Sequence, residues 1–254
     1  MSNLLDKEIN IESKEVNSSE FIKNIISNLS HEIRTPLNGM LGFINLLSSG
    51  NFDNEKKADY LEYLNFSGLE ITKIMDNLVD LSALESGLYK TTLSFVTLPQ
   101  LFEDLMNKIN QSYPLQKLNI TYNIEKQCSR KIISDPKLIR QAFKHLIDNA
   151  LKYSQNKAVK VGCSLTDDKI VFFVKDNGIG IPALANKYLL YKKFFQLNMG
   201  PTRSYNGLGV GLTITKKIVE LLNGNIWYCS EIKKGSTFFF TIPLIIGESL
   251  KSYH

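Results

Sequence analysis

The stretch "SNLSHEIRTPLNGMLGF" (residues 27–43) lies within a longer segment that has an apolar residue at every third or fourth position. This spacing is typical of one face of an α-helix. His31 lies two residues from both Leu29 and Ile33, so at about 100° per residue it points away from the apolar face. The segment predicts one helix over about 18–47. Its apolar positions are Ile22, Ile26, Leu29, Ile33, Leu37, Met40, Ile44 and Leu47.

Pro36 lies inside this predicted helix, five residues after the histidine. Proline has no N–H, so it cannot donate to the carbonyl of Glu32, and its ring crowds that same carbonyl. The missing bond therefore falls in the turn that carries His31 and Glu32. We interpret the proline as a hinge beneath the histidine, and a simple bend in a core helix is the alternative.

A second periodic segment follows the turn residues "SSGNFDNE" and ends at Gly87, a plausible helix C-cap. The two segments together predict an antiparallel helical hairpin. One apolar stripe per helix cannot close a core, so we expect two copies to form a dimeric four-helix bundle, that is, a homodimer. The second stripe consists of Leu61, Leu64, Leu69, Ile71, Ile74, Leu78, Leu81 and Leu84.

The pattern changes after Gly87 to short β-rich runs separated by three amphipathic segments, at 98–111, 136–153 and 208–223. This order predicts an α+β sandwich with one sheet covered by helices, and hence a multidomain chain. The β-rich runs are "TTLSFVTL", "LNITYNIE", "AVKVGCSLT", "KIVFFVKD", "NIWYCSE" and "STFFFTIPL". The predicted divisions are a polar N-terminal segment at 1–17, the helical domain at 18–87, the sandwich at 91–245 and a C-terminal tail at 246–254.

Composition limits the function classes. The 254 residues are 43% hydrophobic and 22% charged, with a net charge of +5 that is spread along the chain, so no polyanionic partner is required and no nucleic acid is expected. Cys128, Cys163 and Cys229 have no CxxC or histidine spacing, which argues against a zinc site or a disulfide framework. No run is long and apolar enough for a bilayer span, and the N-terminus does not resemble a signal peptide. We therefore expect a cytoplasmic chain without membrane contact, and any membrane-anchored sensor part would lie outside it.

Three stretches in the second half carry chemical groups suited to a nucleotide. In "HLIDNALKYS" (145–154), Asn149 and Lys152 share a helix face, and they can meet Mg²⁺ and phosphate oxygens respectively. In "DNGIGIP" (176–182), Asp176 can accept a hydrogen bond from an exocyclic amine such as that of adenine. Taken singly, the first stretch is better explained as the solvent-exposed face of an amphipathic helix, and a tight turn at the end of a strand explains the second about as well.

The third stretch, "NGLGVGLTITKKIVELLNG" (206–224), places several glycines at the start of an apolar helix. Exposed backbone amides at a helix N-terminus suit phosphate groups. The spacing is neither GxGxxG nor GxxxxGK[ST], so it predicts neither a Rossmann nor a Walker A site.

Taken together and in this order, with "FFQL" (194–197) and "KGSTFFF" (234–240), these stretches closely resemble the sensor histidine kinases of bacterial two-component systems. The resemblance runs from about residue 18 to 243. The opening stretch is similar to their H-box, 145–154 to the N-box, 176–182 to G1, 194–197 to the F-box and 207–212 to G2.

The resemblance implies a dimerisation and phosphotransfer domain followed by an ATP-binding domain of the type shared with DNA gyrase, with ATP and Mg²⁺ as cofactors. It implies that His31 is the phosphoacceptor, that Glu32 holds the histidine tautomer or takes its proton, and that Thr35 serves the reverse dephosphorylation of the partner. It implies Asn149 as the Mg²⁺ ligand. The implied nucleotide contacts are Asn149, Lys152, Tyr153, Asp176, Gly178, Gly180, Gly207, Gly209 and Gly211, with Phe194 anchoring a lid at 183–206 and Arg203 as a phosphate contact from it.

The implied activity is autophosphorylation of His31 from Mg-ATP and transfer of the phosphoryl group to an aspartate of a separate response regulator. His145 departs from the pattern, because the N-box usually has asparagine there. Two alternatives stay open: a dimeric scaffold that binds nucleotide without turnover, and an ATP hydrolase of the gyrase-like fold. Hydrolases of that fold carry a glutamate at this position, so His145 weakens the second alternative.

Overall fold

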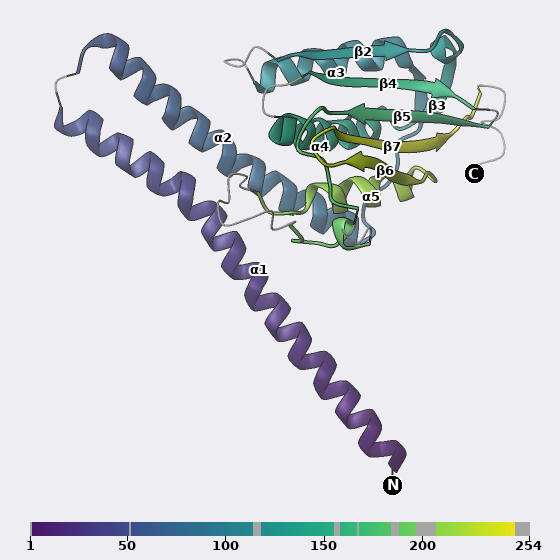
Figure 1. Cartoon of the computed structure of the whole chain (residues 1–254), viewed down its shortest axis with the longest axis horizontal. Helices are drawn as coiled ribbons and strands as arrows, with labels where there is room; N and C mark the ends of the chain where they lie inside the picture. Colours follow the sequence, from purple (N-terminus) through teal and green to yellow (C-terminus); the bar gives the residue numbers. More distant parts are fainter. Residues whose placement is uncertain are drawn as a thin grey trace. The chain divides into compact units, whose positions relative to one another are not determined.

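The computed structural model describes residues 2–50, 52–113, 118–154, 158–166, 168–183, 188–196 and 207–246 (Figure 1), with only the backbone for residues 2–22, 24 and 25. The chain divides into two compact units. The first comprises Met1–Leu78 with Asn206–Leu208, and the second Val79–Tyr205 with Gly209–His254. Each unit is described by itself below.

The first unit is the predicted helical hairpin of α1 (Ser2–Ser49) and α2 (Asn54–Glu85). Asp53 caps α2, since its carboxylate accepts a 2.8 Å hydrogen bond from the backbone N–H of Lys56. Helix α1 begins at Ser2, whereas the apolar periodicity predicted a start near residue 18. The reason is local propensity: residues 2–17 contain no glycine or proline and several good helix formers, so helix continues without an apolar stripe.

Aromatic contacts join the two helices near their connecting turn. The ring of Phe43 on α1 stacks on Tyr63 at 4.9 Å and lies 5.5 Å from Tyr60, both on α2. Phe52 in the turn packs edge-on against Tyr60, with 5.1 Å between the ring centroids. These contacts confirm an antiparallel hairpin. Pro36 is buried, and helix continues through it.

The second unit contains two sheets, where the sequence predicted one. Strands β2, β4, β5, β7 and β6 form a mixed five-stranded sheet in that order, with β2 and β4 parallel and the other pairs antiparallel. β1 and β3 form a separate antiparallel pair. The elements are β1 (Ser94–Thr97), α3 (Leu98–Ser112), β2 (Ile120–Ile124), η1 (Lys126–Ser129), β3 (Lys131–Ser134), α4 (Pro136–Ser154), β4 (Val159–Leu165), β5 (Lys169–Lys175), η2 (Leu189–Tyr191), α5 (Gly211–Leu221), β6 (Ile226–Glu231) and β7 (Gly235–Pro243).

Helices α3, α4 and α5 cover one face of the five-stranded sheet, as predicted (Figure 1). The core between these layers is aromatic. Phe143 of α4 is fully buried, and its ring lies 5.1–5.4 Å from the rings of Phe102, Phe172 and Phe240. Alternate residues of β5 are buried, which is the pattern of a strand with one covered face.

The boundary between the units falls inside α2, because the last turns of that helix pack in the second unit. Gln141 of α4 donates a 2.5 Å hydrogen bond to the carboxylate of Asp80. The carboxylate of Glu85 forms ion pairs with Lys193 and, at 3.9 Å, with Lys217. No helix among the described residues is long and apolar enough to cross a membrane.

Candidate functional site

Helix α4 presents the residues of the predicted N-box. Asp135 is its N-cap, and one carboxylate oxygen accepts hydrogen bonds from the N–H groups of Lys137 (2.9 Å) and Leu138 (3.1 Å). The capped helix fixes the register of the residues that follow. Asn149 is half-buried, and the ammonium of Lys152 lies 5.0 Å from the ring centroid of Tyr153.

The loop after β5 packs directly against the end of α4. The N–H of Ile179 donates to the carbonyl of Tyr153 at 3.3 Å. A Cβ atom on Gly178 would stand 2.2 Å from that same carbonyl oxygen, so only glycine allows this approach. Gly180, two residues later, has a φ of +73° and lies close to the backbone of Glu231. The structure therefore brings the predicted N-box and G1 residues together.

Asp176 directly follows β5 and is 5% exposed. One of its carboxylate oxygens, Oδ1, accepts backbone hydrogen bonds from Gly178 (2.8 Å) and Ser236 (3.2 Å). Burial raises the pKa of this carboxyl, and the bonds from the Gly178 and Ser236 amides partly offset that rise. Since both of these hydrogen bonds use Oδ1, the second oxygen can accept a hydrogen bond from a ligand.

The N-terminus of α5 carries the third set of predicted residues. Val210 occupies the N-cap position and makes no side-chain cap hydrogen bond, so backbone amides of the first turn are not engaged by a cap. Gly209 has a φ of +68°, and a Cβ atom there would lie 2.6 Å from the carbonyl oxygen of Phe195. This contact places the predicted G2 residues, which begin at Gly207, next to the predicted F-box.

Gly211 differs from Gly178 and Gly209, where an added Cβ atom would clash with the backbone. A Cβ atom at this position would meet nothing closer than 3.8 Å, and its nearest neighbours would be Asn149 Nδ2 and His145 Nδ1. Asn149 and the 5%-exposed His145 therefore converge on the first residue of α5. Among the described residues, no atom lies close enough to require a glycine at 211, so the space beside the helix N-terminus can accept a ligand.

The structure describes residues 183 and 188–196 of the predicted lid. Phe194 is half-buried and adopts a φ of +61°, a strained conformation for a bulky residue. The neighbouring Lys193 forms the ion pair with Glu85. Residues 184–187 and 197–206, which include Arg203, lie outside the described residues.

His31 is exposed on α1, as the periodicity predicted, and Glu32 beside it is half-buried. The hydroxyl of Thr35 donates a 3.1 Å hydrogen bond to the carbonyl of His31. Thr35 thus lies on the same side of the helix as the histidine, one turn later. These three residues belong to the first unit.

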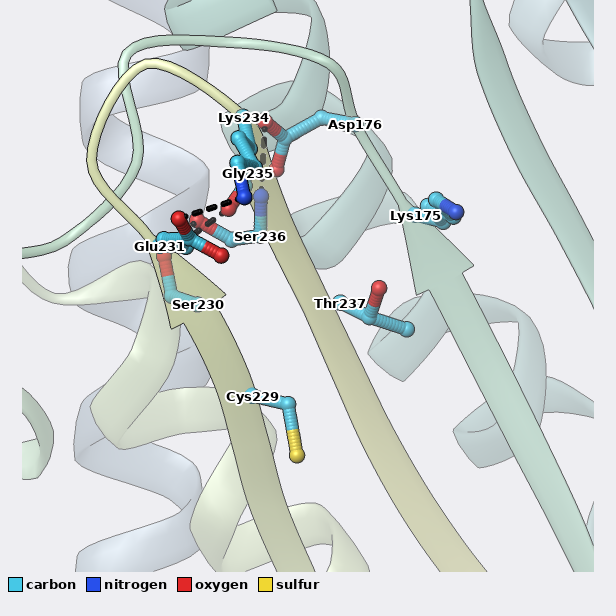
Figure 2. Close-up of a pocket in the computed structure, with 9 residues that line it drawn as sticks. All are labelled: Lys175, Asp176, Cys229, Ser230, Glu231, Lys234, Gly235, Ser236 and Thr237. Carbon is cyan, nitrogen blue, oxygen red and sulfur yellow. Dashed lines mark hydrogen bonds and ion pairs between the residues drawn. The ribbon is translucent and has the colours of Figure 1, made fainter.

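A serine network that the sequence analysis did not single out supports Asp176. Figure 2 shows Ser230 and Ser236 beside the hairpin of β6 and β7, with their hydroxyl oxygens 2.8 Å apart. Ser230 also donates to the carbonyl of Gly235 and accepts from the N–H of Ile181. The stretch "KGSTFFF" was the only signal in the sequence, and it did not indicate that Ser236 reaches a carboxylate sixty residues earlier.

Metal-binding groups are sparse. Within the described residues, no three histidine, cysteine, aspartate or glutamate side chains gather where they could hold a metal ion. The three cysteines are free, and Cys128 and Cys163 are buried. Burial raises the pKa of both buried thiols, which favours their neutral form.

Two family models match the chain. Residues 22–87 match the His Kinase A (phospho-acceptor) domain, and residues 134–246 match the histidine kinase-, DNA gyrase B- and HSP90-like ATPase. The first match contains His31, Glu32 and Thr35. The second contains all the other predicted site residues.

Curated relatives match nearly the whole chain. The signal transduction histidine-protein kinase BarA of Escherichia coli (strain K12) is 30% identical over 96% of this chain, and the sensor protein kinase WalK of Staphylococcus saprophyticus is 32% identical over 89%. The chain spans 27% and 37% of their respective lengths. Among solved structures, the histidine kinase ThkA in complex with the response regulator protein TrrA has the same fold, with a TM-score of 0.64, 20% identity, and coverage of 93% of this chain and 66% of that one.

Proposed function

This chain belongs to the sensor histidine kinases, and on that basis we propose that it binds Mg-ATP in its second unit and transfers the γ-phosphoryl group to His31. The observation that carries the proposal is the convergence of three sequence-distant segments. Tyr153 contacts Gly178, Gly178 donates to Asp176, and Asn149 faces Gly211 at the start of α5. A base, a phosphate chain and a divalent cation can each find suitable groups there.

Asp176 is the proposed adenine contact. A buried carboxylate that already accepts two backbone hydrogen bonds is held in one orientation, so its second oxygen can accept from the exocyclic amine of adenine. Lys152, Tyr153 and Gly180 line the same region. The amides at the start of α5, beside Gly207 and Gly209, are proposed to receive the phosphates.

The residues present fit a magnesium ion that is bound mainly through the nucleotide. Mg²⁺ prefers oxygen ligands, keeps several waters and commonly takes one or two protein ligands plus phosphate oxygens. The amide oxygen of Asn149 would supply the protein ligand, and the absence of an acidic cluster among the described residues is consistent with such a site. When bound, the ion would neutralise phosphate charge.

The proposed phosphoacceptor step requires an exposed, neutral imidazole. A ring nitrogen of His31 attacks the γ-phosphorus, the new N–P bond forms as the bond to the β–γ bridging oxygen breaks, and ADP leaves. Glu32 is adjacent and is proposed to orient the ring or accept its proton. Phe194 and Arg203 are proposed to act from the lid, as anchor and phosphate contact.

The test is incubation of the full chain with Mg-ATP labelled at the γ-phosphate. We expect acid-labile, alkali-stable label that disappears in His31→Gln. His254→Gln is the matched control, because it removes another histidine and should leave the label in place. ATP binding without label would favour the scaffold alternative, and free phosphate with unlabelled protein would favour a hydrolase.

Glu32→Gln separates chemistry from binding. We expect slower labelling with unchanged ATP affinity, because Glu32 lies in the first unit, whereas Asn149, Asp176 and Gly211 lie in the second. Labelling at the original rate would remove Glu32 from the mechanism.

The proposed partners are a second copy of this chain and the receiver domain of a response regulator. The dimer is supported by the match to a phosphoacceptor domain and by apolar side chains left exposed on the hairpin, such as Ile26, Leu37 and Ile44. A histidine kinase of the same fold, ThkA, has been seen with a response regulator protein. We propose that the reaction takes place in the cytoplasm, where ATP and receiver domains are found.

We also propose the reverse activity, dephosphorylation of the partner, with Thr35 as the residue that serves it. Its exposed hydroxyl lies one turn from His31 and is held by the carbonyl of that residue. Thr35→Ala should reduce release of phosphate from a phosphorylated regulator while autophosphorylation persists, and Thr35→Ser should restore the release. Equal losses of both activities would contradict this role.

A further inference from the structure

The second face of the five-stranded sheet, the one opposite the helices, carries an ordered set of side chains that the proposed kinase activity does not use. In Figure 1 this face is turned toward the viewer, and none of the described helices of the second unit lies over it. Strand register decides which side chains share the face, because residues paired across neighbouring strands point the same way.

One row of this face is aromatic. Phe173 on β5 pairs with Phe239 on β7, which pairs with Trp227 on the edge strand β6. The rings of Trp227 and Phe239 stack at 5.4 Å, and Trp227 is 39% exposed. Phe173 lies across the neighbouring strand, since a Cβ atom on Gly162 would stand 2.7 Å from its ring. The row is therefore continuous over three strands.

The next row is basic. Lys160 on β4 pairs directly with Lys175 on β5, and both side chains are exposed. Like charges directly opposite one another destabilise a sheet. No ion pair within the described residues involves either lysine. Glu231, which lines the same recess as Lys175, is paired with Lys234 at 2.6 Å.

A recess adjoins the basic row. Lys175, Thr237 and Cys229 form one line across three strands, and together with Glu231 and Lys234 they border a hollow of about 300 Å³ (Figure 2). This volume is at the lower end for a ligand pocket, and it suits a single inserted side chain. Asp176, Ser230, Gly235 and Ser236 also line the recess, so it adjoins the proposed adenine contact, and the docking face proposed below is defined without it.

From these observations we propose that the aromatic–lysine face, defined as Lys160, Lys175, Phe173, Phe239 and Trp227, docks an acidic protein segment that also carries apolar side chains. The unneutralised lysine pair calls for carboxylates opposite it, and the aromatic row calls for an apolar anchor beside them. An exposed tryptophan beside half-buried phenylalanines and bordered by charge is typical of interface centres. A nucleic acid fits less well, because Trp227 and Phe239 already cover one another's ring faces.

The single tryptophan of the chain is on this face, so its fluorescence reports binding there directly. The experiment titrates the full chain, in the presence of Mg-ADP, with an acetylated peptide of four Glu-Leu repeats. We expect a saturable shift of the emission to shorter wavelength. A Lys-Leu peptide should give no shift, and a Glu-Ser peptide should bind more weakly because it lacks the apolar anchor.

Lys160→Glu is the decisive variant because it separates folding from docking. It converts the repulsive pair with Lys175 into an attractive one, so the melting temperature should rise by roughly 1–3 °C. The same change should weaken Glu-Leu binding by roughly five- to tenfold. Lys108→Glu, at an exposed position on α3, is the matched control and should leave the peptide affinity unchanged.

Three results would overturn the proposal: no emission change with Glu-Leu up to millimolar peptide, an equal affinity in Lys160→Glu, or a shift with an eight-residue oligouridylate but not with Glu-Leu. The last would assign the face to nucleic acid. None of these results depends on phosphorylation of His31, so the docking face and the proposed kinase activity fail independently.

Discussion

Both units of this chain contain many large apolar residues, which are buried in the second unit and partly exposed in the first. In the second unit, four phenylalanines are fully buried within one layer of helices and one sheet. In the first unit, the predicted stripes leave Ile26, Leu61 and Leu69 more than half exposed. The second unit therefore closes a core by itself, whereas the hairpin presents half of one. Exposed apolar surface of this kind indicates an interface, and a second copy of the hairpin completes it.

The largest expected effect is on the self-sufficient core. Phe143→Ala removes a ring that meets three others, and we expect it to lower the free energy of unfolding of the second unit by about 3–5 kcal/mol. Urea unfolding followed by circular dichroism measures the loss. Sedimentation should still show a dimer, because the hairpin is untouched. A dimer lost together with the core would contradict the independence of the two units.

Charged residues on the exposed apolar stripe of the hairpin should weaken the dimer and leave the second unit intact. Leu37→Glu with Ile44→Glu places carboxylates on the exposed stripe, and we expect the dimer dissociation constant to rise by about a hundredfold or more. Analytical ultracentrifugation measures the constant, and ADP binding to the second unit should persist. Asn38→Glu with Asn45→Glu is the matched control, since these exposed residues follow the same two positions. An equal loss in the control would remove the stripe as the interface.

Gly178 and Gly211, both in the proposed nucleotide site, separate a glycine that the fold requires from one that only the ligand requires. Gly178→Ala forces a Cβ atom against the carbonyl of Tyr153, so we expect a loss of stability of about 1–3 kcal/mol along with weaker ADP binding. Gly211→Ala has room within the protein, and alanine favours helix, so stability should be kept or slightly raised. Its ADP affinity should nevertheless fall, because the methyl group enters the space proposed for phosphate. Thermal melts and calorimetric titration distinguish the two, and unchanged ADP affinity in Gly211→Ala would move the phosphates elsewhere.

Local patterns in the sequence were sufficient for much of the fold. The Asp135-Pro136 start of α4, the hairpin of the first unit and the β-rich runs all depend on neighbours within a few residues, and each was confirmed. β3 was not predicted, because Lys131–Ser134 has three buried residues in a row and shows no alternation of exposed and buried positions. The separate sheet that it forms with β1 was missed for the same reason.

The candidate site was predictable only in part. The motifs predicted which segments bind nucleotide, and the structure brings three of the predicted residues, Tyr153, Gly178 and Asp176, into contact. The support of Asp176 by Ser236 depends on strand register between β5 and β7, which no local pattern records. The left-handed backbone of Phe194 was equally invisible, because it is imposed by packing against local preference.

The smallest expected effect concerns the ionisation of Asp176. Burial raises the pKa of this carboxyl above its unfolded value, so the folded state binds the proton more tightly. The stabilisation that this gives is fully present below the unfolded pKa, near 4, and is lost as the pH rises through the higher folded pKa. Asp176→Asn does not titrate and can still accept the two backbone hydrogen bonds.

The melting temperature of Asp176→Asn should therefore rise relative to that of the unmodified chain as the pH increases from about 4 to 7. ADP affinity should change in the opposite sense, because the unmodified chain gains an ionised acceptor for the adenine amine over the same range while the variant does not. Thermal melts and titrations at matched pH values measure both trends. The dimer constant of the hairpin should be the same in both proteins at every pH. A melting difference that is constant with pH would mean that the carboxyl pays no cost for its burial, and the orientation proposed for its second oxygen would lose its physical basis.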